Sequence, residues 1–193
     1  MAPRVLRAEE RTPAPWKNGG GVTSEVAAHP EGAGLDDFAW RVSVAEVARG
    51  GPFSTFEGVD RNITVVQGPG MALTVDGDTH VLDAPHEPFA FPGDAATGCE
   101  LLGGPIVDFN VMVRRSLMSA RVRIERGPTS VRPCPGTGVL AVVLEGRAVL
   151  RRAAVSLGRF DAVLLRDEDN ASFDVDGVLA VVTLTERPGL PGH

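Results

Sequence analysis

Alternation of apolar and polar residues, interrupted by glycine and proline, is the feature of this sequence that most restricts its fold. Residues 38–47 (FAWRVSVAEV), 107–115 (VDFNVMVRR) and 178–186 (VLAVVTLTE) are typical of these segments, and turn residues separate most of them. Side chains of a β-strand alternate between two faces, whereas a helix needs a period near 3.6 residues. The pattern therefore predicts an all-β chain.

Two stretches of the chain share one pattern, in which an apolar strand ends in glycine and a second apolar strand follows. In residues 63–77 (ITVVQGPGMALTVDG) the glycine is Gly68, and in residues 140–153 (LAVVLEGRAVLRRA) it is Gly146. Such duplicated hairpins are typical of cupin barrels, although any β-sandwich also contains hairpins turned by glycine. We predict a bicupin, with two small β-barrels or jelly-roll halves in one chain. The predicted parts are a first half over residues 1–118, which carries the pocket, a structural second half over 119–186, and a disordered tail over 187–193.

Charge and cysteine content exclude several classes of protein. The formal net charge of −6 and the pI near 5.2 give no positive field that would attract a phosphate backbone. The two cysteines have neither metal-site spacing nor the density of a disulfide scaffold. The N-terminus lacks the apolar segment of a signal peptide, and no apolar run reaches membrane-spanning length. We expect a cytoplasmic protein that binds neither nucleic acid nor membranes.

The segment where a cupin barrel carries its metal ligands has unsuitable residues in this chain. Ser54 and Phe56 occupy the spacing of the usual His-x-His pair, and Asp60 and Arg61 lie at the acidic position. The four histidines form no pair two or four positions apart. An arginine stays protonated, so Arg61 repels a cation but suits a carboxylate. We therefore expect no metal and no cofactor, and a pocket for an organic anion.

Polar residues recur on one face of each of two predicted strands. Arg41 and Ser43 alternate with Trp40, Val42 and Val44 on one strand. On the other, residues 108, 110 and 112 alternate with Phe109, Val111 and Val113. These rows would meet solvent on the outside of a barrel and would line a pocket on its inside. The recurrence of Arg, Ser, Asp and Asn favours the inside.

The stretch NGGGVTSE (residues 18–25) has two interpretations. Its glycines would let the backbone cross the pocket mouth and offer N–H groups to an anion, with Asn18 and Thr23 adding side-chain bonds. Alternatively, the segment is a tight turn that leads into the first strand. It is not a phosphate-binding loop, because no Gly-Lys-Ser/Thr follows it.

Four ordered motifs resemble the HutD/Ves family of bicupin proteins. They are W-K-N-G-G-G-x-T-x-E (16–25), D-F-x-W-R-V-S-V-A (37–45), G-P-F-S-x-F-x-G-V-D-R (51–61) and D-F-N-V-M-x-R (108–114). The resemblance is strong over residues 10–115 and continues more weakly to about 186. It implies a two-barrel cupin without a demonstrated catalytic role. It also implies a link to stress response or to histidine utilisation, where members bind a small acid such as formylglutamate or urocanate and moderate pathway expression.

The sequence thus predicts a binding protein for a small anionic metabolite rather than an enzyme. Trp40 and Phe56 are expected to wall or support the site. Cupins often pair through sheet edges, so a homodimer is a further expectation. The alternative is a metal-free isomerase or hydrolase with Asp108 or Asp60 as general base. The predicted ligand-binding residues are Asn18, Gly19, Gly20, Thr23, Trp40, Arg41, Ser43, Ser54, Phe56, Arg61, Asp108 and Asn110; none is predicted to be catalytic or to bind a metal.

Overall fold

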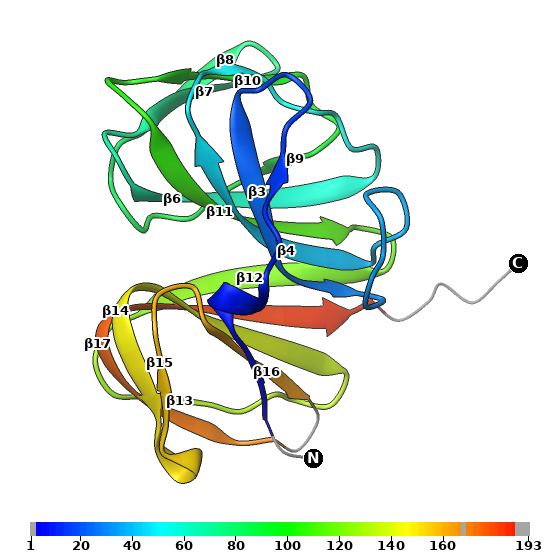
Figure 1. Cartoon of the computed structure of the whole chain (residues 1–193). Coiled ribbons are helices and arrows are strands. Elements are labelled where there is room, and N and C mark those ends of the chain that lie inside the picture. Colours follow the sequence, from blue (N-terminus) through cyan, green and yellow to red (C-terminus); the bar gives the residue numbers. More distant parts are fainter. Residues whose placement is uncertain (1–2, 167–168, 188–193) are drawn as a thin grey trace, which may run out of the picture. The chain divides into compact units, whose positions relative to one another are not determined.

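The computed structural model describes residues 3–166 and 169–187, and its regular structure there consists of β-strands and two short 3₁₀ turns (Figure 1). The prediction of an all-β chain is confirmed. No helix in these two ranges has the length and apolar character needed to cross a membrane.

The chain divides into two units, which we call the first unit (residues 12–116) and the second unit (residues 1–11 and 117–193). The predicted boundary at residue 118 lies close to the observed one. Residues 1–11, however, belong with the second unit, because strand β1 (Arg4–Leu6) pairs with β16 (Ala162–Arg166). The predicted tail over residues 187–193 lies outside the described residues except for Arg187, whose N–H donates to the carbonyl of Leu117.

The first unit consists of two antiparallel sheets. The six-stranded sheet has the order β2 (Ala14–Pro15), β3 (Gly21–His29), β4 (Trp40–Val47), β11 (Ile106–Arg114), β6 (Val59–Gln67) and β9 (Phe89–Pro92). The four-stranded sheet has the order β5 (Gly51–Pro52), β10 (Thr97–Leu101), β7 (Met71–Val75) and β8 (Asp78–Leu82). The first apolar strand ends next to Gly68, as predicted, but the predicted hairpin is wrong: β6 and the following β7 lie in different sheets and do not pair with each other.

One face of the six-stranded sheet packs against the four-stranded sheet. Its buried residues are Ala45 and Val47 of β4, Ile63 and Val65 of β6, Phe91 of β9 and Ile106 of β11, which meet Met71, Leu73 and Cys99. These side chains follow the period-two alternation of their strands. The apolar core therefore occupies one part of this face, and the polar residues described below lie further along the same strands.

The second unit is built on one seven-stranded sheet. Its main path runs β1, β16, β14 (Thr137–Leu150), β17 (Ala171–Glu186) and β12 (Met118–Glu125), while β13 (Thr129–Val131) pairs with β17 and β15 (Val155–Leu157) with β14. Two 3₁₀ turns, η1 (Ala8–Glu10) and η2 (Arg151–Ala153), belong to this unit. Its core is largely aliphatic and includes Val139, Ala141 and Val143 of β14, together with Leu165, Phe173 and Leu179.

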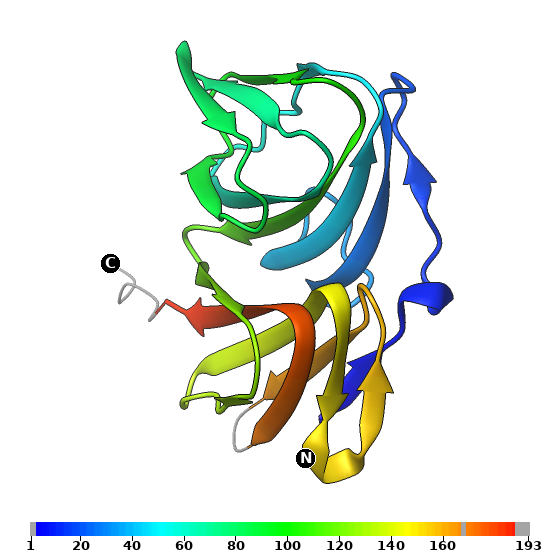
Figure 2. The same ribbon diagram turned by 90° about the vertical axis from the view of Figure 1, so that its left-hand side faces the viewer.

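The prediction that Gly146 turns a hairpin is wrong. Strand β14 passes through Gly146 without interruption, and Figure 2 shows it as one strongly bent ribbon (yellow). The ladder with β17 shifts register between Val143 and Glu145, which marks a β-bulge, and Gly146 faces Gly177. The core-facing residues of β14 have odd numbers up to Val143 and even numbers from Ala148 on, so the alternation changes phase at the bulge. In the sequence, such a change of phase looks the same as the end of one strand and the start of the next.

Candidate functional site

Strand register brings the predicted polar residues of the first unit together on one face. In the β4–β11 ladder, Ser43 lies opposite Asn110 and Arg41 lies opposite Met112. In the β6–β11 ladder, Arg61 also lies opposite Met112. Residues directly opposite each other in an antiparallel pair point to the same side. Arg41, Ser43, Arg61, Asn110 and, two positions along β11, Asp108 therefore share a face, the one that carries the core.

The face that carries this polar row points inward. The exposed fractions are 3% for Ser43, 9% for Arg61, 1% for Asp108 and 7% for Asn110. A row of solvated side chains would be far more exposed, so the solvent-facing alternative is wrong for these four residues. Burial of charged groups in this way requires compensating partners.

A short chain of hydrogen bonds connects three of these residues. Arg61 donates from Nη2 to Oδ1 of Asn110 over 2.9 Å, and Nδ2 of Asn110 donates to Oδ1 of Asp108. Within the described residues, the buried Nε of Arg61 has no hydrogen-bond partner. Asn110 thus separates the guanidinium from the carboxyl, and one buried donor of the arginine lacks an acceptor among the described residues.

Three aromatic rings surround the guanidinium of Arg61. Its Cζ lies 5.1 Å from the ring centroids of Phe53 and Phe91 and 5.8 Å from that of Phe56. A guanidinium over an aromatic face is stabilised by the ring quadrupole, and more strongly when it is desolvated. Phe56, which is expected to wall or support the site, contacts Arg61 in this way. Phe53 and Phe91 were not predicted, because their contact with Arg61 arises only after three separate segments fold together.

Burial shifts the pKa values of both ionisable groups in the interior. The pKa of Arg61 is lowered to about 10, mainly by desolvation; the charge of Asp108 opposes this shift and the charge of Arg41 adds to it. Desolvation raises the pKa of Asp108 to about 7, against the opposing effects of Arg61 and Asn110. Arg61 therefore stays charged at neutral pH, while burial favours the protonated, neutral form of Asp108.

The raised pKa of Asp108 predicts a pH-dependent loss of stability. An aspartate with an ordinary pKa of 3.8 in the unfolded chain and about 7 in the fold stabilises the protein below about pH 4, and this contribution is lost as the pH rises to 7. Asp108→Asn cannot ionise and still accepts from Asn110. From pH 5 to pH 8 we expect its free energy of unfolding, relative to wild type, to rise by on the order of 2 kcal/mol. Urea denaturation at both values measures this difference, and a constant difference would contradict it.

An ion pair between Arg41 and Glu25 lies on the same face of the sheet. Arg41 donates from Nε to Oε2 of Glu25 on β3 over 2.8 Å, and Glu25 lies opposite Ser43 in the ladder. The arginine is the more buried partner, and the glutamate is more than a third exposed. Glu25 was missing from the predicted site, although its alternation with Thr23 in the segment 18–25 was the available signal. Arg41 is thus neutralised by a carboxylate, whereas Arg61 donates to a neutral amide.

Residues 16–21 form a tight turn, in which the groups predicted to contact an anion have partners within the protein. The N–H of Gly20 donates to the side chain of Asn18 over 2.9 Å, and the N–H of Gly19 donates to the carbonyl of Trp16. Thr23 accepts from the indole of Trp16 over 2.7 Å. These groups are engaged within the turn, which is the alternative interpretation of the glycines.

Two further predicted residues lie away from the polar row. Trp40 is on the opposite face of β4, where its ring stacks on His29 at 6.2 Å, because residues 40 and 41 alternate in direction. Ser54 is exposed in the loop between β5 and β6. Neither residue walls or lines the interior around Arg61.

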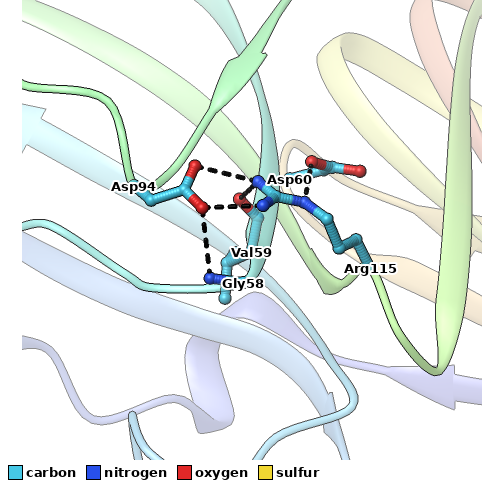
Figure 3. Close-up of polar contacts among 5 residues, drawn as sticks. All are labelled: Gly58, Val59, Asp60, Asp94 and Arg115. Carbon is cyan, nitrogen blue, oxygen red and sulfur yellow. Dashed lines mark hydrogen bonds and ion pairs between the residues drawn. The ribbon is translucent and has the colours of Figure 1, made fainter.

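Asp60 belongs to a separate cluster rather than to the interior. Arg115 donates from Nε to Asp60 over 2.8 Å and makes two bonds, of 2.7 and 3.0 Å, to Asp94 (Figure 3). Its Nη2 also donates to the carbonyl of Val59, and Asp94 accepts from the N–H of Gly58. Asp60 is therefore engaged with Arg115 and does not pair with Arg61.

The residues at the expected cupin metal position do not fit a metal ion. Arg61 is a buried cation there, and its neighbours are an amide and three aromatic rings. Within residues 3–166 and 169–187, no group of three or more His, Cys, Asp or Glu side chains is arranged to hold one. The donor set instead suits an organic anion.

Similar proteins agree with the fold and the motifs. The HutD family profile matches residues 8–183. A Pseudomonas putida relative, "Uncharacterized 21.2 kDa protein in hutC 3'region", is 38% identical over an alignment of 192 positions, which covers 95% of this chain and 98% of that protein. Protein Ves from Citrobacter koseri is 40% identical over 111 residues, or 56% of each chain.

Solved structures also resemble this chain. HutD from Pseudomonas fluorescens SBW25 has a TM-score of 0.84 and 36% identity, covering 96% of this chain and 100% of that one. The bacterial pirin YhhW from Escherichia coli, in complex with nickel(II), has a TM-score of 0.65 at 13% identity, covers 97% of this chain and 100% of that one, and shares the fold alone. The family resemblance of the four motifs is confirmed, and this chain belongs to the HutD family.

Proposed function

We propose that the first unit binds a small carboxylate metabolite beside Arg61 and thereby moderates histidine utilisation or a related pathway, without catalysing a reaction. The observation that carries this proposal is the buried guanidinium of Arg61, whose Nε has no hydrogen-bond partner among the described residues. A carboxylate pairs with arginine through two parallel bonds and would satisfy that donor. The expected ligands resemble formylglutamate or urocanate.

The balance of charge in the interior supports an anionic ligand. Glu25 neutralises Arg41, but Arg61 faces an amide and a carboxyl whose pKa is raised to about 7. Near neutral pH the charge of Arg61 is therefore not fully balanced by Asp108, whose neutral form burial favours. An arriving carboxylate would favour the protonated form of Asp108 further, so that the two acids do not repel each other.

The link to a pathway is supported by the names of relatives. The Pseudomonas putida relative is named after the hutC region, and family membership associates this chain with the histidine-utilisation region. This association concerns the setting of the protein and not its ligand. The ligand class rests on the residues around Arg61.

A second candidate is a metal-free enzyme acting on a small organic acid. The raised pKa of Asp108, about 7, would suit a general base, and Arg61 would hold the acid close to it. Asp60 no longer fits this role, because it pairs with Arg115. Incubating wild type and Asp108→Asn with each ligand and following the ligand by NMR separates the candidates, since only an enzyme gives products that the variant does not.

Ligand-dependent stabilisation tests the proposed function. We expect N-formylglutamate, urocanate or glutarate to raise the melting temperature, because a ligand at 100 times its Kd adds about 2.7 kcal/mol to the free energy of unfolding. Matched neutral compounds, glutaramide and urocanic acid methyl ester, should have no effect. Absence of any shift with all three acids would contradict the proposal.

A further inference from the structure

Arg115 connects three segments of the first unit that are distant in sequence. It follows β11, and its guanidinium contacts Asp60 at the start of β6 and Asp94 in the turn after β9 (Figure 3). Its own N–H donates to the carbonyl of Gly58 over 2.9 Å. Figure 3 shows the side chain of Arg115 between the two carboxylates, with the N–H of Gly58 bound to Asp94.

The segments held by Arg115 are those that enclose Arg61. The N–H of Phe56 donates to the carbonyl of Gly93 over 2.8 Å. The N–H of Gly93 in turn donates to the carbonyl of Val59 over 2.7 Å. A Cβ atom at Gly93 would lie 3.3 Å from Cδ of Arg61, so this turn approaches the arginine closely. Residues 53–58 therefore reach Arg61 with one end fixed by the 93–94 turn and by Arg115.

We propose that Arg115 is a positioning residue, which fixes residues 53–58 against the 93–94 turn and so keeps the rings of Phe53 and Phe56 on the guanidinium of Arg61. Its effect on ligand affinity rests on the function proposed above. Its effect on the enclosure of Arg61 is independent of that function and can be measured without a ligand.

The geometry distinguishes this role from a general contribution to stability. Exposed ion pairs contribute little to the free energy of unfolding, and Arg115 is about a third exposed. Two bonds from one guanidinium to one carboxylate, with a third to Asp60, fix orientation as well as distance. The hydrogen bond from Arg115 lowers the pKa of Asp94 to about 2, so this carboxylate is ionised at any pH at which the protein would work.

Amide hydrogen exchange tests the proposal directly. In Arg115→Ala we expect the amides of Phe56 and Gly93 to exchange about tenfold faster or more, while the amides of Ile63 and Val111 stay protected. The matched control is Arg151→Ala, which removes a comparable two-bond pair with Asp174 in the second unit. Asp94→Asn keeps the size of the side chain and should change exchange in the same direction but less, and Arg115→Lys should restore part of the protection.

Labelling with phenylglyoxal adds a second readout without a ligand. Mass mapping should show Arg61 labelled several-fold faster in Arg115→Ala than in wild type or Arg151→Ala, because the rings no longer cover it. Unchanged exchange at Phe56 and Gly93 in both Arg115→Ala and Asp94→Asn, or unchanged labelling of Arg61, would overturn the proposal.

The affinity for N-formylglutamate separates this proposal from the proposed function. If wild type binds, Arg115→Ala should bind several-fold more weakly, with a partial recovery in Arg115→Lys. If wild type binds none of the three acids, the proposed function fails, while exchange and labelling still decide the role of Arg115.

Discussion

Replacing Arg61 by alanine is expected to weaken carboxylate binding about ten- to a hundredfold, since a hydrogen bond to a charged group is worth about 1.5–3 kcal/mol. The variant loses the only buried cation that donates to Asn110 among the described residues. Arg61→Lys keeps the charge but not the planar fork, and should recover part of the affinity. Isothermal titration with N-formylglutamate measures both variants.

The alternative is that Arg61 has a purely structural role. In that case Arg61→Ala would lower the melting temperature and leave the affinity unchanged. Arg147→Ala is the matched control for loss of one positive charge, because Arg147 is highly exposed and lies in the second unit. It should alter neither quantity appreciably. A loss of affinity in Arg61→Ala with a normal melting temperature supports the anion site.

Gly177→Ala is expected to destabilise the protein by about 3 kcal/mol or more. Gly177 has a φ of +137°, and an added Cβ would lie 2.0 Å from the carbonyl oxygen of Glu145 on the facing strand. That atom belongs to the backbone, so the two strands would have to separate at the bulge. Strain at a disfavoured φ and overpacking each cost about 1–3 kcal/mol.

A second glycine separates these two causes. Gly127 also has a positive φ, of +78°, but an added Cβ there would meet no atom within 4 Å. Gly127→Ala should therefore show only the conformational cost, about 1–2 kcal/mol. Urea denaturation of both variants measures the difference, and equal destabilisation would contradict the close approach of β14 and β17 at Gly177.

The polar row could be predicted from the sequence because it depends only on local geometry. Arg41 and Ser43 are two residues apart, as are Asp108 and Asn110, so strand alternation places each pair on one face regardless of the rest of the fold. That the two strands are neighbours, and that this face is buried, required the ladder between β4 and β11. From the sequence, only the types of these residues indicated that the face lies inside the barrel.

Other features could not be predicted, because they depend on contacts between distant segments. The bulge at Gly146 needs Gly177 opposite it, and within residues 140–153 it looks the same as a hairpin turn. Phe53 and Phe91 meet at Arg61 from different strands and loops. The glycines at 19 and 20 suit both a ligand loop and a tight turn, and only the bonds of Asn18 and Trp16 distinguish these.

A titration with carboxylates reports on binding at Arg61 itself when it is followed at the Arg61 side chain. In ¹⁵N–¹H spectra, the arginine Nε–H signal that is missing in Arg61→Lys identifies this group. Because Nε of Arg61 has no partner among the described residues, its signal should shift and saturate when N-formylglutamate, urocanate or glutarate supplies an acceptor. A signal that stays unchanged at high concentrations of all three acids would show that no carboxylate binds at Arg61.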